Sequence, residues 1–231
     1  MVRRRRSRAA RNPADTLSTV QYVLNGGNGG AANDLVGAFY AGSPVEHLRL
    51  LLESDDEHVL KTGVWIVSEL GSRATPLLDT VAPLLNHPSD GVRYYALEAV
   101  GTNATAARDR VVASAVQCVR DPNAEVRGQA LRCLSRMTDE QIDGCRVRIH
   151  DPALRILLAW LFELDATESR AQDIVQRLDN ADVLARRFAA VAARRLGLYD
   201  AAPLQRAASS LDPDVRQFAE RELDILKPRR G

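Results

Sequence analysis

The residue types that most often carry out chemistry are sparse in this chain, and their spacing fits no common catalytic pattern. The four histidines, His47, His58, His87 and His150, form no His-Glu-x-x-His pair, and none stands at metal-ligand spacing from a cysteine. We interpret them as solvated or capping groups near helix ends and turns. The sequence therefore predicts no catalytic residue, no metal site and no cofactor.

The cysteines and the glycine-rich stretch also favour structural interpretations. Cys118, Cys133 and Cys145 are an odd set, which indicates free thiols in a reducing compartment rather than a disulfide framework. Cys133 and Cys145 are expected to be buried small hydrophobes, not nucleophiles. The stretch Asn25–Gly30 lacks a following Gly-Lys-Ser/Thr and a preceding strand, so we predict a connector rather than a phosphate-binding loop.

Charge is distributed unevenly along the 231 residues. The overall balance of 31 basic and 30 acidic residues gives a net charge of +1. The first eleven residues hold six arginines and no acid, which leaves 25 basic and 30 acidic residues in the remainder. Residues 1–12 are therefore predicted to be a disordered basic arm. Three functions are open for it: a solvated tail, a salt-sensitive nucleic-acid arm, or an electrostatic hook that folds onto the acidic body of the chain or onto an acidic protein partner. Its arginines are Arg3, Arg4, Arg5, Arg6, Arg8 and Arg11.

Nothing in the sequence favours a membrane location. No apolar stretch approaches the roughly 20 residues that a membrane-spanning helix needs. The arginine run is followed by Asn12-Pro13-Ala14-Asp15, where a secretion signal would have its apolar region. We therefore expect a cytoplasmic protein without membrane contact.

An internal repeat dominates the rest of the chain. Its anchor residues are spaced by 28 to 34 residues, and an aspartate precedes each of them: Val59, Val92, Val126, Leu154, Ala185 and Val215. Apolar or small residues follow at offsets of about +4, +5 and +8, which lie on one face of a helix. A second apolar segment precedes each anchor, and Ser43–Glu46 has the pattern of a capping box. Each copy is thus predicted to be a helix, a tight turn and a second helix.

The pattern Asp-Pro-x-x-Val-Arg followed by Ala resembles the HEAT repeat over residues 43–226, especially the short PBS-lyase HEAT-like variety. The resemblance implies an all-α fold, a right-handed α-α superhelix (HEAT/armadillo-like solenoid) of about six helical hairpins. Residues 13–42 would form an N-terminal capping segment and residues 227–231 a tail. The family pattern also implies that the turn aspartates pair with ladder arginines of neighbouring repeats, here Arg93, Arg127, Arg155, Arg186 and Arg216. Leu158 replaces the small residue of other copies, so the helices of that copy are expected to pack further apart.

The outward column of the second helices is the predicted binding face. Offset +6 lies opposite the apolar offsets and holds both tryptophans of the chain. In the family this face is concave and binds extended partners. Each tryptophan has an alternative position, packed against the adjacent repeat. The predicted partner-binding set is Trp65, Glu69, Tyr94, Glu98, Arg132, Arg136, Trp160 and Arg187.

These residues favour a non-catalytic protein-interaction scaffold or adaptor, of the type of bacterial immunity or regulator HEAT proteins, in a monomer or weak homo-oligomer. The alternative is a nucleic-acid-binding protein similar to the alkylpurine DNA glycosylases, because Glu69 follows Trp65 by four residues. The net negative charge beyond the arm is a poor match for that alternative, since phosphate neutralisation supplies most non-specific DNA affinity.

Overall fold

The computed structural model describes residues 13–27, 29–163, 168–197 and 199–227. The predicted arm, with Arg3, Arg4, Arg5, Arg6, Arg8 and Arg11, lies outside the described residues, as do residues 228–231. Within the described ranges the chain forms fourteen α-helices and five 3-10 helices, and no strand. The expected all-α class is confirmed.

The second helix of each predicted repeat is present and contains the anchor residue. An Asp or Asn side chain caps five of the six by accepting backbone N–H bonds from the first turn, so the turn aspartate begins the second helix as well as following the first. These helices are α4 (Glu57–Glu69), α6 (Asp90–Asn103), α8 (Ala124–Arg136), α10 (Pro152–Phe162), α12 (Val183–Leu196) and α14 (Pro213–Leu226).

The first helices are shorter and partly of 3-10 form. Pro76 lies inside one 3-10 segment and Pro83 begins another, which limits regular α-helix there. The expected capping box at Ser43 is wrong, because the Ser43 hydroxyl pairs with Thr16 at 2.8 Å and gives the helix no cap. The first helices are η1 (Val45–Leu48) with α3 (Arg49–Leu52), η2 (Gly71–Leu77) with α5 (Leu78–Val81) and η3 (Ala82–Asn86), η4 (Ala106–Arg108) with α7 (Asp109–Gln117) and η5 (Cys118–Arg120), α9 (Asp139–Arg146), α11 (Glu168–Leu178) and α13 (Ala202–Ala208).

A further helix pair precedes the six repeats. α1 (Pro13–Leu24) packs on α3, and α2 (Gly29–Tyr40) packs on α4, so this pair continues both helical layers. α2 begins at Gly29, inside the stretch Asn25–Gly30 that the sequence predicts to be a connector. Burial of Ala31, Ala32 and Leu35 in the core accounts for this early start despite its two glycines.

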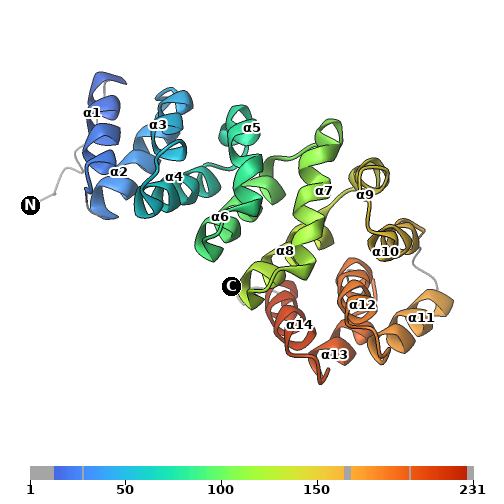
Figure 1. Cartoon of the computed structure of the whole chain (residues 1–231). Helices are drawn as coiled ribbons and strands as arrows, with labels where there is room; N and C mark the ends of the chain where they lie inside the picture. Colours follow the sequence, from blue (N-terminus) through green and yellow to red (C-terminus); the bar gives the residue numbers. More distant parts are fainter. Residues whose placement is uncertain (1–12, 28, 164–167, 198, 228–231) are drawn as a thin grey trace, which may run out of the picture.

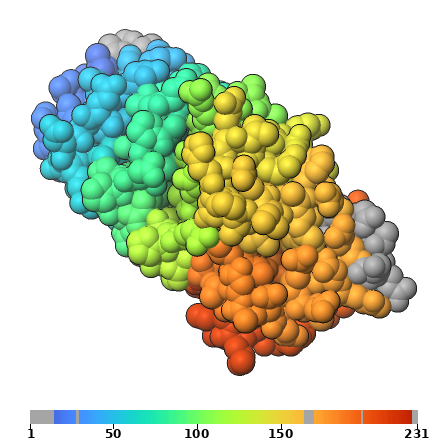
Figure 2. Space-filling view, turned by 45° about the vertical axis from the view of Figure 1, so that its right-hand side comes forward, coloured from blue at the N-terminus to red at the C-terminus, as the bar shows by residue number. Residues whose placement is uncertain are grey.

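The layer of second helices does not follow the chain order throughout. α2, α4, α6 and α8 are stacked in sequence, but α12 then packs against α8, and α14 contacts both. Figure 1 shows α12 and α14 beside α8, while α9 and α10 lie to the right of α8 in this view. In the space-filling view the orange and red C-terminal repeats are folded against the green and yellow middle of the molecule (Figure 2). The last two repeats therefore pack against α8 of the third repeat and do not simply extend the stack.

Side-chain size explains why α12, and not α10, approaches α8. The five residues Ala189–Ala193 of α12 are all buried, so this helix is enclosed on every side. Their small side chains allow close helix contact. The equivalent stretch of α10 carries the larger side chains of Leu158 and Trp160, which are also buried. The wider helix packing that the sequence predicts at Leu158 stays a prediction.

The predicted arginine ladder is only partly regular. Arg93 binds Asp121 of the next repeat through two hydrogen bonds of 2.7 and 2.8 Å, and Arg186 binds Asp212 in the same way at 3.2 and 3.0 Å. Both also donate to carbonyls of their own turn. Arg155 makes no such contact within the described residues, and Arg216 reaches only the Ser210 carbonyl. The neighbour rule implied by the resemblance therefore fails at Arg155 of the fourth repeat, and also at Arg127 of the third, which binds Asp214.

Asp214, in the first turn of α14, is bound by two arginines from other helices. We call Asp214, Arg127 and Arg187 the clasp. Arg127 of α8 donates two bonds to its carboxylate at 2.7 and 3.0 Å, and Arg187 of α12 donates a third at 2.6 Å. Burial alone would raise the pKa of Asp214, but these guanidinium groups outweigh it and lower the pKa below its usual value. The clasp joins three second helices that are far apart in the sequence.

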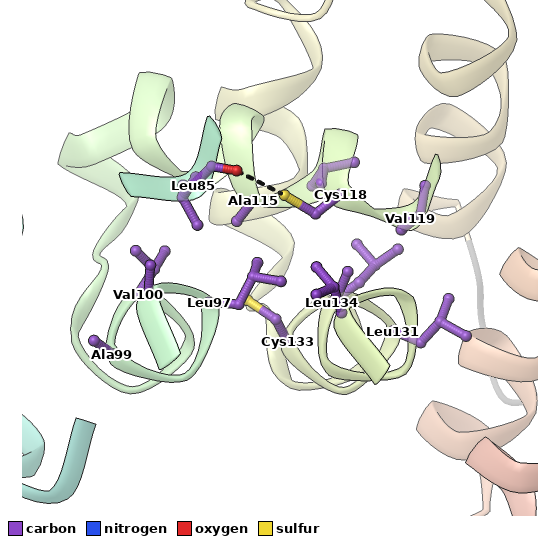
Figure 3. Packing of buried hydrophobic residues seen from close by; sticks show 14 of the residues in the cluster. Leu85, Leu97, Ala99, Val100, Ala115, Cys118, Val119, Leu131, Cys133 and Leu134 are labelled. Carbon is purple, nitrogen blue, oxygen red and sulfur yellow. Dashed lines mark hydrogen bonds between the residues drawn. The ribbon is translucent and has the colours of Figure 1, made fainter. Parts of the chain in front are cut away.

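The core lies between the two helical layers, and it contains the cysteines. Figure 3 shows Cys118 and Cys133 among Leu97, Val100 and Leu134, with the Cys118 thiol directed to the Leu85 carbonyl at 3.9 Å. All three cysteines are buried and unpaired, as expected. Burial raises the pKa of each thiol to about 12.

We expect none of the three thiols to react with iodoacetamide at pH 8 in the native protein. A thiol with a pKa near 12 holds almost no thiolate, and thiolate is the nucleophile. Intact mass after labelling should show no adduct in buffer and three in guanidinium chloride. Rapid native labelling of any one cysteine would contradict this packing.

Candidate partner-binding face

Six of the eight predicted site residues share one surface of the stacked second helices. Trp65 and Glu69 come from α4, Tyr94 and Glu98 from α6, and Arg132 and Arg136 from α8. Each is half-buried or exposed. Together with Tyr95 we call these residues the second-helix face. The helical period that buries the anchor residues directs this column away from the core.

An apolar hollow of about 330 Å³ lies at the N-terminal end of the face. The half-buried Trp65 and Tyr95 of the next repeat both line it. α2 contributes Ala32 and Asn33, and α4 adds Lys61 and Thr62. A space of this size and lining accepts an apolar or aromatic side chain.

A second, more polar hollow of about 610 Å³ lies further along the face. Tyr94 and Glu98 of α6 and Arg132 and Arg136 of α8 line it on one side. The far wall comes from the last helix, α14, through Arg221, Asp224 and the exposed Ile225. This wall exists only because the C-terminal repeats fold back against α8.

Two tyrosines connect the hollows. The rings of Tyr94 and Tyr95 meet edge to face with centroids 5.3 Å apart, and each ring lines one hollow. Arg132 donates to the Tyr94 hydroxyl at 3.0 Å and also binds Gln129 of its own helix. These contacts hold the aromatic pair in place between the two spaces.

The face carries charges of both signs. Burial raises the pKa of Glu98; nearby Arg132 acts against this and Glu69 adds to it. Burial also raises the pKa of Tyr95. The polar hollow is lined by three acids and three arginines, namely Glu98, Glu125, Asp224, Arg132, Arg136 and Arg221. A balanced lining of this kind suits polypeptide better than a phosphate backbone, which needs excess positive charge.

Trp160 does not lie on this face, which corrects the expectation of an exposed indole. Its side chain is buried, with only 8% of the residue exposed. The indole Nε1 donates to Asp173 of α11 at 2.7 Å, and Arg177 stacks on the ring at 4.5 Å. Trp160 therefore joins α10 to α11, the alternative that the sequence left open.

Arg187 also differs from its expected role. It belongs to the clasp, where it binds Asp214 and donates to the Val119 carbonyl at 2.7 Å. Its side chain is only 12% exposed. The prediction assumed that α12 stacks next to α10 in chain order. Instead α12 packs against α8, so Arg187 points towards the third repeat.

Two parts of this surface, Tyr95 and the α14 wall, were not predicted from the sequence. Tyr95 stands beside Tyr94 at offset +3, a position that faces the preceding repeat and could have been found from the helical wheel. No local signal places Arg221 and Ile225 near Arg132, because 89 or more residues separate them in the chain. They come close to Arg132 because α14 packs against α8 and not only against its neighbours in the chain.

The described residues contain neither a metal-binding cluster nor a membrane-spanning helix. No group of three or more His, Cys, Asp or Glu residues there could hold a metal ion. No helix in the same ranges is long and apolar enough to cross a membrane.

Comparison with known families agrees with the repeat geometry. Residues 78–161, which span the second to fourth repeats, match the family model for HEAT repeats. Stacked helical hairpins on both sides extend this unit, so the described chain is an α-solenoid that is similar to HEAT repeats over residues 78–161. The resemblance to HEAT repeats is thus confirmed, whereas the PBS-lyase-like variety stays an expectation. No match to a curated protein was found.

Several solved structures are similar overall. An engineered protein is 19% identical over 92% of this chain and 88% of its own, with a TM-score of 0.47. A designed armadillo repeat protein in complex with the peptide (KR)4 is 19% identical over 93% and 92%, with a TM-score of 0.48. A computationally designed armadillo repeat protein for modular peptide recognition is 17% identical over 93% and 92%, with a TM-score of 0.46.

Proposed function

We propose that this protein is a non-catalytic scaffold or adaptor that binds a protein partner along its second-helix face. The observation that carries this proposal is the pair of adjacent hollows joined by Tyr94 and Tyr95. Trp, Tyr and Arg are the residue types most enriched at binding hot spots, and here they gather on one continuous surface.

The two hollows differ in chemistry, which indicates how a partner is oriented. The Trp65–Tyr95 space takes an apolar anchor, and the Arg132–Arg136 space takes a polar or charged group. A partner segment that spans both would cross α4, α6 and α8. Side chains fixed on packed helices lose little freedom on binding, so the face is pre-organised.

The proposal predicts that Trp65→Ala with Tyr94→Ala weakens partner binding at least about a hundredfold, because two central aromatic contacts are lost. The partner is first identified by affinity capture from the producing cells and mass spectrometry. Its dissociation constant is then measured by calorimetry with purified wild-type and variant protein.

Tyr199→Ala provides the matched control, since Tyr199 is 81% exposed and lies outside the face. It should bind as the wild type does, and all variants should keep the helical circular-dichroism signal. Unchanged affinity in the double variant would overturn the proposal. So would tight binding of duplex DNA by a variant whose arm arginines are replaced by glutamine.

A further inference from the structure

The carboxyl ends of three second helices form a continuous edge of the second-helix face. Tyr40 at the end of α2 donates to the Glu69 carbonyl at the end of α4 at 2.7 Å. Thr75, which follows α4, donates to Asn103 at the end of α6 at 3.1 Å. None of these helices has a basic residue in its last turn, whereas α8 and α12 do. No basic side chain in these last turns therefore offsets their partial negative charges.

Two carboxylates add full charges to this edge. Glu69 is exposed at the last turn of α4, and the half-buried Glu98 of α6 lies near it, because burial raises the pKa of Glu98 and the charge of Glu69 raises it further. Neither forms an ion pair within the described residues, and Arg132 beside them is engaged by Gln129 and Tyr94. Arg73 lies over the Tyr40 ring at 5.5 Å, and Arg136, whose charge also acts on Glu98, is 3.8 Å from Glu222. We call Glu69, Glu98 and these helix ends the acidic edge.

Aromatic rings lie next to the two carboxylates. Tyr95 is near enough to Glu69 and Glu98 for both to affect its hydroxyl, and it lines the apolar hollow together with Trp65. Carboxylates together with ring faces are the partners that a guanidinium group prefers, through ion pairing and cation–π contact. The acidic edge therefore has the chemistry of an arginine-binding surface.

The chain itself supplies an arginine-rich segment attached at this end. Residues 1–12 precede Pro13, the first residue of α1, and contain six arginines without an acid. Thr16, one turn into α1, binds Ser43 just after α2, so α1 begins at the same edge of the molecule. Three helix spacings amount to about 30 Å. Twelve extended residues reach about 40 Å.

We propose that the arginine arm, residues 1–12, docks in cis on the acidic edge and pairs with Glu69 and Glu98. Both groups belong to this chain, so the docking does not depend on the proposed function. It places the arm at one end of the second-helix face, where a partner has to share or displace it. The arm then acts as an intramolecular competitor rather than as a free tail.

The test uses the full chain with all six arm arginines changed to glutamine, so that its own arm no longer occupies the acidic edge. These arginines are Arg3, Arg4, Arg5, Arg6, Arg8 and Arg11. A fluorescein-labelled peptide of residues 1–12 is titrated against this variant by anisotropy. We expect saturable binding in 20 mM salt that weakens about tenfold or more in 300 mM salt. The wild-type chain should bind the peptide at least about tenfold more weakly, because its own arm is present at high effective concentration.

Glu69→Gln with Glu98→Gln in the same background should weaken peptide binding about tenfold. Glu53→Gln with Glu57→Gln removes the same charge at the opposite end of α4 and should change it less than about twofold. If the two double variants bound the peptide with equal affinity, the proposal would be overturned. Equal affinity of wild type and arm variant would overturn it too. So would a wild-type dimer in sedimentation that the arm variant lacks, since the arm would then dock on a second copy.

Discussion

Asp214→Asn is expected to lower the free energy of unfolding by about 3 kcal/mol, the usual loss when one partner leaves a buried ion pair. The substitution removes the carboxylate charge that faces Arg127 and Arg187, whose side chains are only 18% and 12% exposed. Two guanidinium groups then stay buried between α8, α12 and α14 without a counter-charge. Urea denaturation followed by circular dichroism measures the loss.

The same carboxylate gives the stability a defined pH dependence. The pKa of Asp214 is lower in the folded protein than in the unfolded chain, so its contribution is complete above the unfolded value of about 3.9. It is lost as the pH falls through the lower, folded pKa. The difference between wild type and Asp214→Asn should therefore be full at pH 7 and shrink in acid.

Asp224→Asn is the control for Asp214, because it is an acid of the same helix with an exposed partner. Asp224 pairs with Lys227 at 2.6 Å, but both side chains are 72% exposed. We expect a change below about 0.5 kcal/mol. Equal losses at the two positions would mean that Asp214 does not join the repeats as described.

Trp160→Ala is expected to lower the free energy of unfolding by about 4 kcal/mol, as for other buried aromatic side chains. It leaves a cavity between α10 and α11 and removes the Nε1 donor from Asp173 and the ring from Arg177. Binding of the partner should not change in the folded fraction. Thermal and urea unfolding, together with the calorimetric assay, measure the two effects separately.

Trp65→Ala makes the comparison specific, since it removes the same side chain from a half-buried position on the face. We expect it to cost less stability than Trp160→Ala, about 2 kcal/mol, because Trp65 is only partly buried. Its main effect should be on partner affinity. If the two alanine variants lost the same stability and the same affinity, the distinction between a packed and a binding tryptophan would be wrong.

Periodicity along the chain was sufficient to predict the repeating units. Anchors such as Val59 and Val126 recur at a nearly constant spacing, and each lies in a second helix that begins beside its turn aspartate. This information is local, because helix formation and capping depend on residues within a few positions of one another. The exposed column with Trp65, Glu98 and Arg132 could be read from the same period.

The order in which repeats pack was not accessible in the same way. Arg127 and Asp214 are 87 residues apart, and the resemblance to HEAT repeats implied a neighbour for Arg127 instead. The all-apolar stretch Ala189–Ala193 indicates an enclosed helix, but it does not say which helix encloses it.

The sequence by itself thus determined the helical hairpins and the side that α4, α6 and α8 present. Only the tertiary structure decided that α12 takes the place beside α8, that Trp160 and Arg187 are structural, and that α14 completes the polar hollow. The physical reason is that the hairpin pattern depends on contacts a few residues apart. The closure depends on which bulky and small surfaces, here Leu158 and Trp160 against the alanines of α12, can approach one another across the whole chain.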